Sequence, residues 1–570
     1  MAAQEPASTS KADSSRARKT GIARLSIVPA DAAPVRRSGI ARLVTVFFSA
    51  VLWTLASTAL SVVNPANFYD TTAVATQKLT QRLVAPWYPW QARDRITVVT
   101  FDTATLWDIG QRWPVDLDTH WAVLETILAY RPRAVFVDIF YRNAPRGWPD
   151  KDRDSLVTLD TIIDGADPDG SHRPIPVFFA DYYPTDRAQC PGRHVCAAES
   201  HAADAPDALL PYLAARSLEA CFRNTVGDHR LVYATWSGYG PSYPLRLPPS
   251  TACAPDGGAP AAGASTATPA FALYRAVCRQ PGARADTALP GCRDLSVLQA
   301  DPSWPVDVRW GWFVSEQRRL LNSAADGQND IWPCKATQDA GDHDSWSAKA
   351  GLVLRHLKDL VPVRWSRAPD HGPCSFHDIY PAAPLIDHVV PHNVFEDDPM
   401  MRRLIADRII LMGASSDIGR DEIVSPVHGR VSGINLHAMA LDNLLTFGAR
   451  YWRDLSHRYF LAVPWSEWLE IITLFVVGLL GFTGRELSEA ARLGAASGVM
   501  SPTNLRRIFN ILATLAPAAI GIVCATVLHV APSNWVGLMV VSLVLWVTGV
   551  QTTLGQPARL MTARLFPRVE

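Results

Sequence analysis

The sequence lacks a net charge: 54 lysines and arginines are balanced by 54 aspartates and glutamates over 570 residues. A chain without a basic excess has no general attraction for phosphate backbones, so we expect no nucleic-acid partner. Cysteines at the short C-x-x-C spacing are also missing, which argues against a zinc ribbon and against a dithiol redox motif. We therefore expect neither a metal nor a cofactor.

Long uncharged runs, by contrast, are present. The segments 43–63, 509–530 and 535–554 carry no Lys, Arg, Asp or Glu, and each is close to the roughly 20 residues that a membrane helix needs. A fourth segment, 465–482, is weaker because it contains Glu467 and Glu470. If it spans a membrane, these glutamates should lie near the water interface, because a carboxylate in hydrocarbon is costly.

The basic residues indicate the orientation of these segments. Residues 1–42 carry eight Lys and Arg against three acids, and arginines recur in 483–508 and 555–570. Basic segments stay in the cytoplasm, and only four spans place all three of them inside and the uncharged turn 531–534 outside. A cleaved signal peptide is the alternative for the first span, but it would have a shorter apolar core nearer the N-terminus.

The predicted organisation is that of a multi-pass protein of the inner or plasma membrane with both termini in the cytoplasm. Its parts are a disordered tail (1–42), four membrane helices (43–63, 465–482, 509–530 and 535–554), an extracytoplasmic domain (64–460), a cytoplasmic loop (483–508) and a cytoplasmic tail (555–570).

Eight of the nine cysteines fall in residues 64–460. An even number of cysteines in an oxidising compartment predicts disulfides, although the sequence leaves the pairing open. Cys278 and Cys292 have a separation that suits a closed loop of about 15 residues. The cysteine-rich stretches 187–225 and 249–300 are interpreted as loops or insertions held by disulfides.

Strands and helices alternate in the predicted extracytoplasmic domain. Apolar, β-branched runs predict strands at 95–102, 134–140, 177–181, 307–312 and 408–412, and helical spacing predicts helices at 117–130, 271–278 and 433–445. Strand, helix and strand at this spacing form βαβ units, so the predicted fold is α/β with a mainly parallel sheet.

The stretch RIILMGASSDIGRDEIVSP (408–426) has the form of a ligand-binding turn after a strand. It matches neither G-x-x-x-x-G-K-[ST] nor G-x-G-x-x-G, and Asp417 would repel a phosphate. It also lacks G-x-S-x-G, the turn that carries a catalytic serine. What remains is a turn at the carboxyl end of a strand, where α/β folds place ligands.

Four stretches together resemble the type-two family of CHASE domains, over roughly residues 67–450. They are ITVVTFD with the later WPVDLDTHWAVLETILAYRPRAVFVDIFY; GDHRLVY with PSYPLR and FALYRAVC; VDVRWGW; and RIILMGASSDIGRDEIVSPVHGRVSGINLHAMALDNLL. The resemblance implies an extracellular sensory domain with one span before it and several after it. Such domains usually accompany a cytoplasmic kinase or cyclase, which this chain lacks, so we expect no enzymatic activity of its own.

The expected function is therefore detection of a small ligand or an envelope condition, with a signal passed through the membrane helices to a separate cytoplasmic signalling protein. A homodimer is an open alternative for the assembly. Two other functions also stay open: a structural envelope or assembly protein that binds another protein, and an extracytoplasmic hydrolase that uses the aspartates and His437.

Most of the candidate ligand-binding residues lie at strand ends or in the segment after the last predicted strand, and Trp113 lies between the first predicted strand and the helix that follows it. The alternative role of Asp102 and Asp138 is capping of the next turn or helix. The alternative role of Trp113 and His437 is packing in the core. The alternative role of the two glycines is to meet a backbone need, at a tight turn for Gly413 and at a helix start for Gly433. A metal site of His437, Asp417 and Asp421 has no supporting spacing. The candidates are Asp102, Trp113, Asp138, Gly413, Ser415, Asp417, Asp421 and His437.

Overall fold

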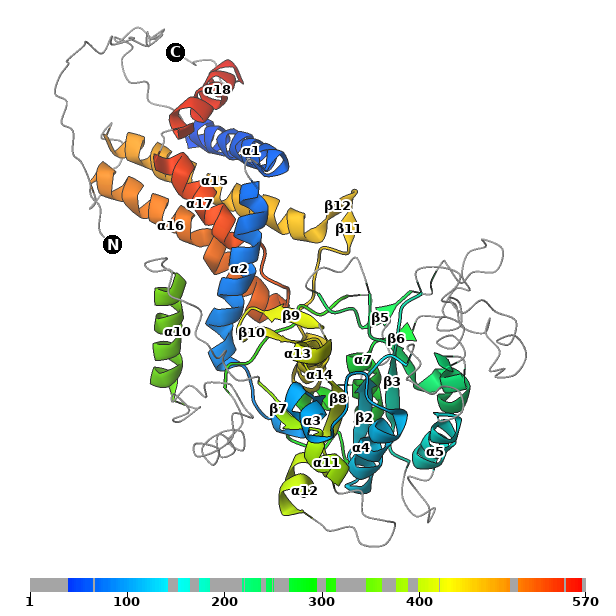
Figure 1. Cartoon of the computed structure of the whole chain (residues 1–570). Helices are drawn as coiled ribbons and strands as arrows, with labels where there is room; N and C mark the ends of the chain where they lie inside the picture. The colour runs from blue at the N-terminus through cyan, green and yellow to red at the C-terminus, as the bar shows by residue number, and fades with distance from the viewer. Residues whose placement is uncertain are drawn as a thin grey trace, which may run out of the picture.

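The computed structural model describes residues 39–64, 67–141, 152–164, 174–184, 218–219, 221–236, 242–248, 250, 266–294, 304–313, 345–360, 376–387, 398–419, 421–492, 501–547 and 550–565. Figure 1 shows an α/β domain and a group of long helices, with helix α2 (Phe68–Val84) running between them.

A six-stranded parallel sheet forms the centre of the α/β domain, in the order β4-β3-β2-β8-β1-β7. The predicted α/β class is confirmed. Four predicted strands are present as β1 (Ile96–Phe101), β2 (Ala134–Asp138), β3 (Val177–Asp181) and β8 (Ile409–Ala414), joined by β4 (Leu231–Tyr233) and β7 (Asp378–Pro381).

Helices cover both faces of this sheet. Alternate residues of each strand point to opposite sides: Ile96 and Val98 pack under α14 (Ile434–Phe447) and α7 (Pro269–Cys278), whereas Val99 and Phe101 pack under α4 (Leu117–Ala129). Because both faces are buried, the central strands carry apolar or β-branched residues at nearly every position, and their sequences do not alternate between apolar and polar residues. The same second face carries α5 (Asp152–Asp164), α11 (Ala383–Asp387) and α12 (Pro399–Ile405).

The strand predicted at 307–312 is wrong. This segment is irregular, and the nearest strand pairing is an isolated bridge from Val306 to Tyr243 and to Arg453. Its apolar side chains, Val308 and Trp310, are buried against α14 instead. Burial, and not strand pairing, accounts for the apolar pattern.

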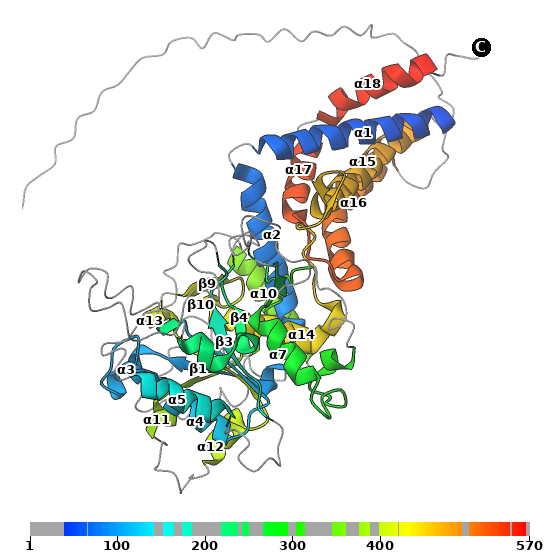
Figure 2. The same cartoon turned by 90° about the vertical axis from the view of Figure 1, so that its right-hand side faces the viewer.

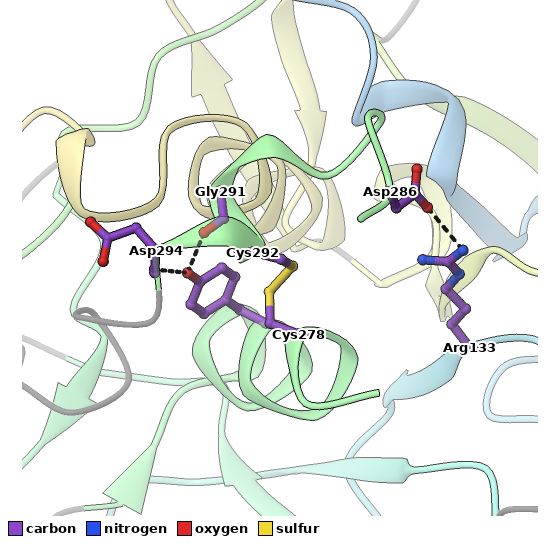
Figure 3. Close-up of a disulfide and its surroundings, with 7 residues drawn as sticks. Arg133, Cys278, Asp286, Gly291, Cys292 and Asp294 are labelled. Atoms are coloured by element: carbon purple, nitrogen blue, oxygen red, sulfur yellow. Dashed lines mark hydrogen bonds and ion pairs between the residues drawn. A yellow bond between two sulfur atoms is a disulfide. The ribbon is translucent and has the colours of Figure 1, made fainter. Parts of the chain in front are cut away.

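A disulfide joins Cys278 at the end of α7 to Cys292 in a short 3-10 helix, Pro290–Arg293 (Figure 3). Their Cα atoms are 5.0 Å apart. The predicted pair is confirmed. The hydroxyl of Tyr274 donates to the carbonyl of Gly291 at 2.8 Å, and a Cβ on Gly291 would lie 2.1 Å from the Leu444 carbonyl of α14. The disulfide loop therefore lies directly against the end of α14. Cys221 is also disulfide-bonded, Cys524 is free, and Cys190, Cys196, Cys253, Cys334 and Cys374 lie outside the described residues.

Three helices of the described chain are long and apolar enough to cross a membrane: α1 (Gly39–Val63), α15 (Trp465–Arg492), and α16 (Pro502–Val523) with its π-helical continuation to Leu528. The weak span at 465–482 is thus part of one of them. The remaining predicted span, 535–554, is divided between α17 (Trp535–Val547) and the start of α18 (Val550–Leu565), and it stays a prediction. Residues 1–38 of the predicted N-terminal tail lie outside the described residues. We call α1, α15, α16 and α17 the helical bundle (Figure 2).

Helix α2 contacts the helical bundle at one end and the α/β domain at the other. Near its middle, Thr76 accepts from Val536 N at 3.2 Å and donates to Asn534 at 3.0 Å. Near its end, Gln81 donates to the Val308 carbonyl at 3.0 Å and accepts from the Trp310 N–H at 3.2 Å. These contacts make α2 a direct link between the two parts.

Candidate functional site

Asp138 and His437 approach each other at the carboxyl edge of the sheet. Asp138 is the last residue of β2, and His437 lies in the first half of α14. Their side chains are 7% and 6% exposed, and Asp138 Oδ2 lies 3.8 Å from His437 Nε2. This distance is too long for a hydrogen bond. His437 Nδ1 is instead hydrogen-bonded to the hydroxyl of Tyr243 at 2.8 Å.

Burial keeps both groups uncharged. It raises the pKa of Asp138 to about 8, with the nearby negative charge of Asp421 adding to the shift. Burial also lowers the pKa of His437 to about 3. At neutral pH the two side chains are therefore a protonated carboxyl and a neutral imidazole, not an ion pair. Such a pair offers hydrogen-bond donors and acceptors to a ligand without a fixed charge.

Two glycines make room for this arrangement. Gly413 lies beside Asp138 in the sheet, and a Cβ on it would come within 2.9 Å of Ile434 Cδ1 and 3.1 Å of Asp138 Cβ. A Cβ on Gly433 would lie 2.0 Å from a carboxylate oxygen of Asp421. The tight turn expected at Gly413 is wrong, whereas Gly433 does stand at a helix start, as the N-cap of α14. Gly413 is inside β8, Gly433 has a φ of −55°, and the need in both cases is space.

We call Asp138, Tyr243, Gly413, Asp421 and His437 the Asp138 cluster. Tyr243 is its one member that the sequence did not indicate as a candidate. It lies in the PSYPLR stretch, but nothing in the local sequence connects it to a histidine 194 residues away. Aromatic rings complete the surroundings of His437: Phe136, Trp236 and Tyr243 have ring centroids 5.5, 5.9 and 5.6 Å from the imidazole.

Asp417 and Ser415 form a second group beside the same edge. Asp417 accepts from the Thr103 N–H at 3.0 Å and from the Thr103 and Ser415 hydroxyls. Partial burial alone would raise the pKa of Asp417, but the hydrogen bonds from Ser415 and Thr103 outweigh it, so the pKa lies below its ordinary value. This ionised carboxylate ties the short helix α13 (Ser416–Gly419) to the start of α3 (Thr103–Asp108).

Asp102 and Trp113 have local roles in the structure. Asp102 is the N-cap of α3, and its side chain accepts from the Thr105 N–H at 2.7 Å. This is the capping role that was weighed against ligand binding. The Trp113 ring packs with its centroid 6.0 Å from both Phe101 and His120. The eight candidates thus divide into the Asp138 cluster, the Asp417 group, a cap and a packing residue.

The metal hypothesis gains no support. Within the described ranges, no group of three or more His, Cys, Asp or Glu side chains is arranged to hold a metal ion. Asp417 is engaged by Thr103 and Ser415, while His437 is bonded to Tyr243. The Asp138 cluster therefore has the composition of a hydrogen-bonding site.

Comparison with known families gives one match. The family model of the CHASE2 domain matches residues 44–205 and 297–483, more than half of the chain. No curated protein and no solved structure matches. The match includes β1, β2, β8 and α14 and extends into α1 and α15. The interval without a match, 206–296, contains Tyr243, the Cys278–Cys292 disulfide and the GDHRLVY, PSYPLR and FALYRAVC stretches. The chain belongs to the CHASE2 domain family, a family of sensory domains.

Proposed function

We propose that this protein is a membrane-anchored sensor without catalytic activity. Its α/β domain would lie outside the cytoplasm and detect a small ligand or an envelope condition at the Asp138 cluster. The helical bundle would pass the resulting shift to a separate cytoplasmic signalling protein. The observation that carries the proposal is the direct hydrogen-bonded link between the α/β domain and the helical bundle, in a chain of a sensory-domain family.

The link is made at two places that converge on the turn between α16 and α17. Helix α2 reaches Asn534 and Val536, as described above. The segment that follows α14 reaches the end of α16 and the same turn. Trp452 Nε1 donates at 2.9 Å to the carbonyl of Ala525, in the π-helical end of α16, and Arg453 N donates to the His529 carbonyl at 3.0 Å. A ligand that favours one arrangement of the α/β domain would thereby favour one arrangement of the helices.

The same contacts support the proposed orientation. The turn 531–534, which the arginine distribution assigns to the outside, lies against the α/β domain, because Ala531 N donates to the Arg453 carbonyl at 3.0 Å. An extracytoplasmic α/β domain and an external turn need to be at the same end of the bundle. Both termini would then be cytoplasmic, in an inner or plasma membrane.

A ligand screen by thermal shift on the full chain in detergent tests the proposal. A ligand of the Asp138 cluster should raise the melting temperature of the wild type but not that of His437→Gln. Asp102→Asn is the matched control, because it alters a strand-end aspartate that serves as a cap; it should keep the ligand response. A ligand that stabilises all three proteins equally would place the site elsewhere. A full screen without any stabilising ligand would favour the alternative of an assembly protein.

A further inference from the structure

A cavity lies where the helical bundle meets α2. It has a volume of about 160 Å³ and is lined by α1, α2, α15 and α17, the helices that meet at this junction in Figure 2. No residue of the Asp138 cluster lines it. One water molecule occupies about 30 Å³ of liquid, so the cavity has room for more than a single water.

Most of the cavity wall is apolar. Leu60 of α1, Phe68 of α2, Leu474 of α15 and Leu538 and Val541 of α17 all line it. A wall of this kind favours an aliphatic group, because its burial removes apolar surface from water.

One side of the wall is acidic. Glu467 and Glu470 are three residues apart on α15 and both line the cavity, as expected for neighbours on one helix face. Glu470 accepts from the Tyr69 hydroxyl and from the Asn534 N–H at 3.2 Å. Burial and the negative charge of Glu470 raise the pKa of Tyr69, so its hydroxyl remains a donor. In the described part of the chain, no Lys, Arg or His forms an ion pair with either glutamate.

A hydroxyl without a partner also lines the cavity. Ser57 is 5% exposed, and its Oγ has no hydrogen-bond partner among the residues that the structure describes. A serine or threonine in a helix commonly donates to the carbonyl one turn earlier, as Thr54 does to Ala50 at 2.8 Å. Ser57 does not, so a polar group of an occupant would supply its missing bond.

We propose that this cavity binds an amphiphile with a primary ammonium head and an aliphatic body. The ammonium would lie between the carboxylates of Glu467 and Glu470, and the aliphatic body would lie along the apolar wall. Amine-headed lipids and free alkylamines share this chemistry. The proposal does not depend on the sensory function. An occupant would, however, contact α2 and three bundle helices together and so stabilise one arrangement of the junction.

Native mass spectrometry of the full chain in a neutral detergent tests the binding, with octylamine as the probe. We expect one octylamine per chain, bound at least tenfold more tightly than octanol, which has the same body but no charge. The Glu467→Gln/Glu470→Gln variant should weaken octylamine binding at least tenfold, and Ser57→Leu should abolish it by filling the cavity. Glutamine still accepts from Tyr69 and Asn534, so the double variant should keep the wild-type melting temperature.

Glu422→Gln is the matched control, because it removes one carboxylate from an exposed hairpin; it should bind octylamine as the wild type does. Octanol binding as tightly as octylamine, or the double variant binding octylamine unchanged, would overturn the proposal. Nanodiscs of phosphatidylethanolamine or of phosphatidylglycerol then identify the source of the amine. If phosphatidylethanolamine blocks octylamine binding and phosphatidylglycerol does not, the occupant is a lipid with an amine head group. If neither lipid blocks it, the occupant is a free amine.

Discussion

Replacing Asp138 by Asn should change how the stability of the protein depends on pH. In the folded chain, burial and then the charge of Asp421 raise the pKa of Asp138 from 3.8 to about 8. Between these two values the folded chain holds a proton that the unfolded chain has released. Rising pH therefore favours unfolding throughout this window, and the contribution levels off above pH 8. Asparagine is neutral at every pH and removes the effect.

The magnitude follows from the two pKa values. Each pH unit inside the window costs the wild type about 1.4 kcal/mol. Near pH 8 the slope declines, so the total from pH 6 to pH 8 is about 2 kcal/mol. A change of this size moves a melting temperature by a few degrees in a domain of this class. The difference in melting temperature between Asp138→Asn and the wild type should therefore increase by a few degrees from pH 6 to pH 8.

The assay is thermal unfolding of the full chain in detergent, followed by tryptophan fluorescence at pH 6, 7 and 8. Asp417→Asn is the control, because hydrogen bonds from Ser415 and Thr103, acting against burial, hold the pKa of Asp417 below its ordinary value. Its difference from the wild type should stay constant over this range. If the Asp138→Asn difference is equally constant, Asp138 is not protonated in the folded chain, and the neutral pair with His437 is wrong.

Four further outcomes are expected. His120→Phe should stabilise the protein by about 1–3 kcal/mol, because neither ring nitrogen of the buried His120 has a hydrogen-bond partner within the described ranges. Burial lowers the pKa of His120 to about 3, so the wild type should also lose stability as pH falls below about 6.5 and the variant should lose less, by thermal unfolding. Asp102→Ala should cost about 0.5–2 kcal/mol in the same assay through loss of the cap. Serine at Cys278 and Cys292 should cost about 3 kcal/mol, measured against the oxidised wild type. Reporter fusions should read in, out, in and in at residues 30, 300, 495 and 565; a fusion at 495 that reads outside would contradict the four-span topology.

The sheet could be predicted where its strands are buried on both faces. ITVVTF and AVFVD consist mainly of β-branched and aromatic residues. Such a composition predicts a strand without knowledge of the tertiary structure. The strands β4 and β7 could not be predicted, since they have three and four residues and β7 ends in a proline. The segment 307–312 shows the opposite failure. Its backbone is irregular, and its apolar side chains are buried against α14. The sequence pattern alone cannot distinguish such a buried irregular segment from a buried strand.

The candidate site was predictable to the extent that it depends on strand ends. Asp138 ends β2 and Gly413 lies in the adjacent parallel strand β8, so their proximity results from the pairing of these strands. The Tyr243 partner of His437 depends on an excursion of the chain outside the sheet, which no local pattern encodes. Asp102 shows how two correct rules can compete. It does follow a strand, but the next residues begin a helix whose Thr105 N–H needs an acceptor. The Asp102 carboxylate accepts this hydrogen bond and so serves as a cap.

The link between the two parts of the chain was only half predictable. The sequence indicated one route, from the turn after β8 through α14 to the second span, because these elements follow one another. The route through α2 depends on amide and hydroxyl groups of Thr76 and Gln81, whose partners are more than 220 residues away. Polar residues on a connecting helix look like a solvated face until those partners are known. In the structure, the segment after α14 contacts the turn between α16 and α17, and α2 contacts the same turn, so a movement of the α/β domain against α2 would strain that turn from two sides. We therefore expect the turn, and not the N-terminal helix alone, to be where the domain acts on the membrane helices.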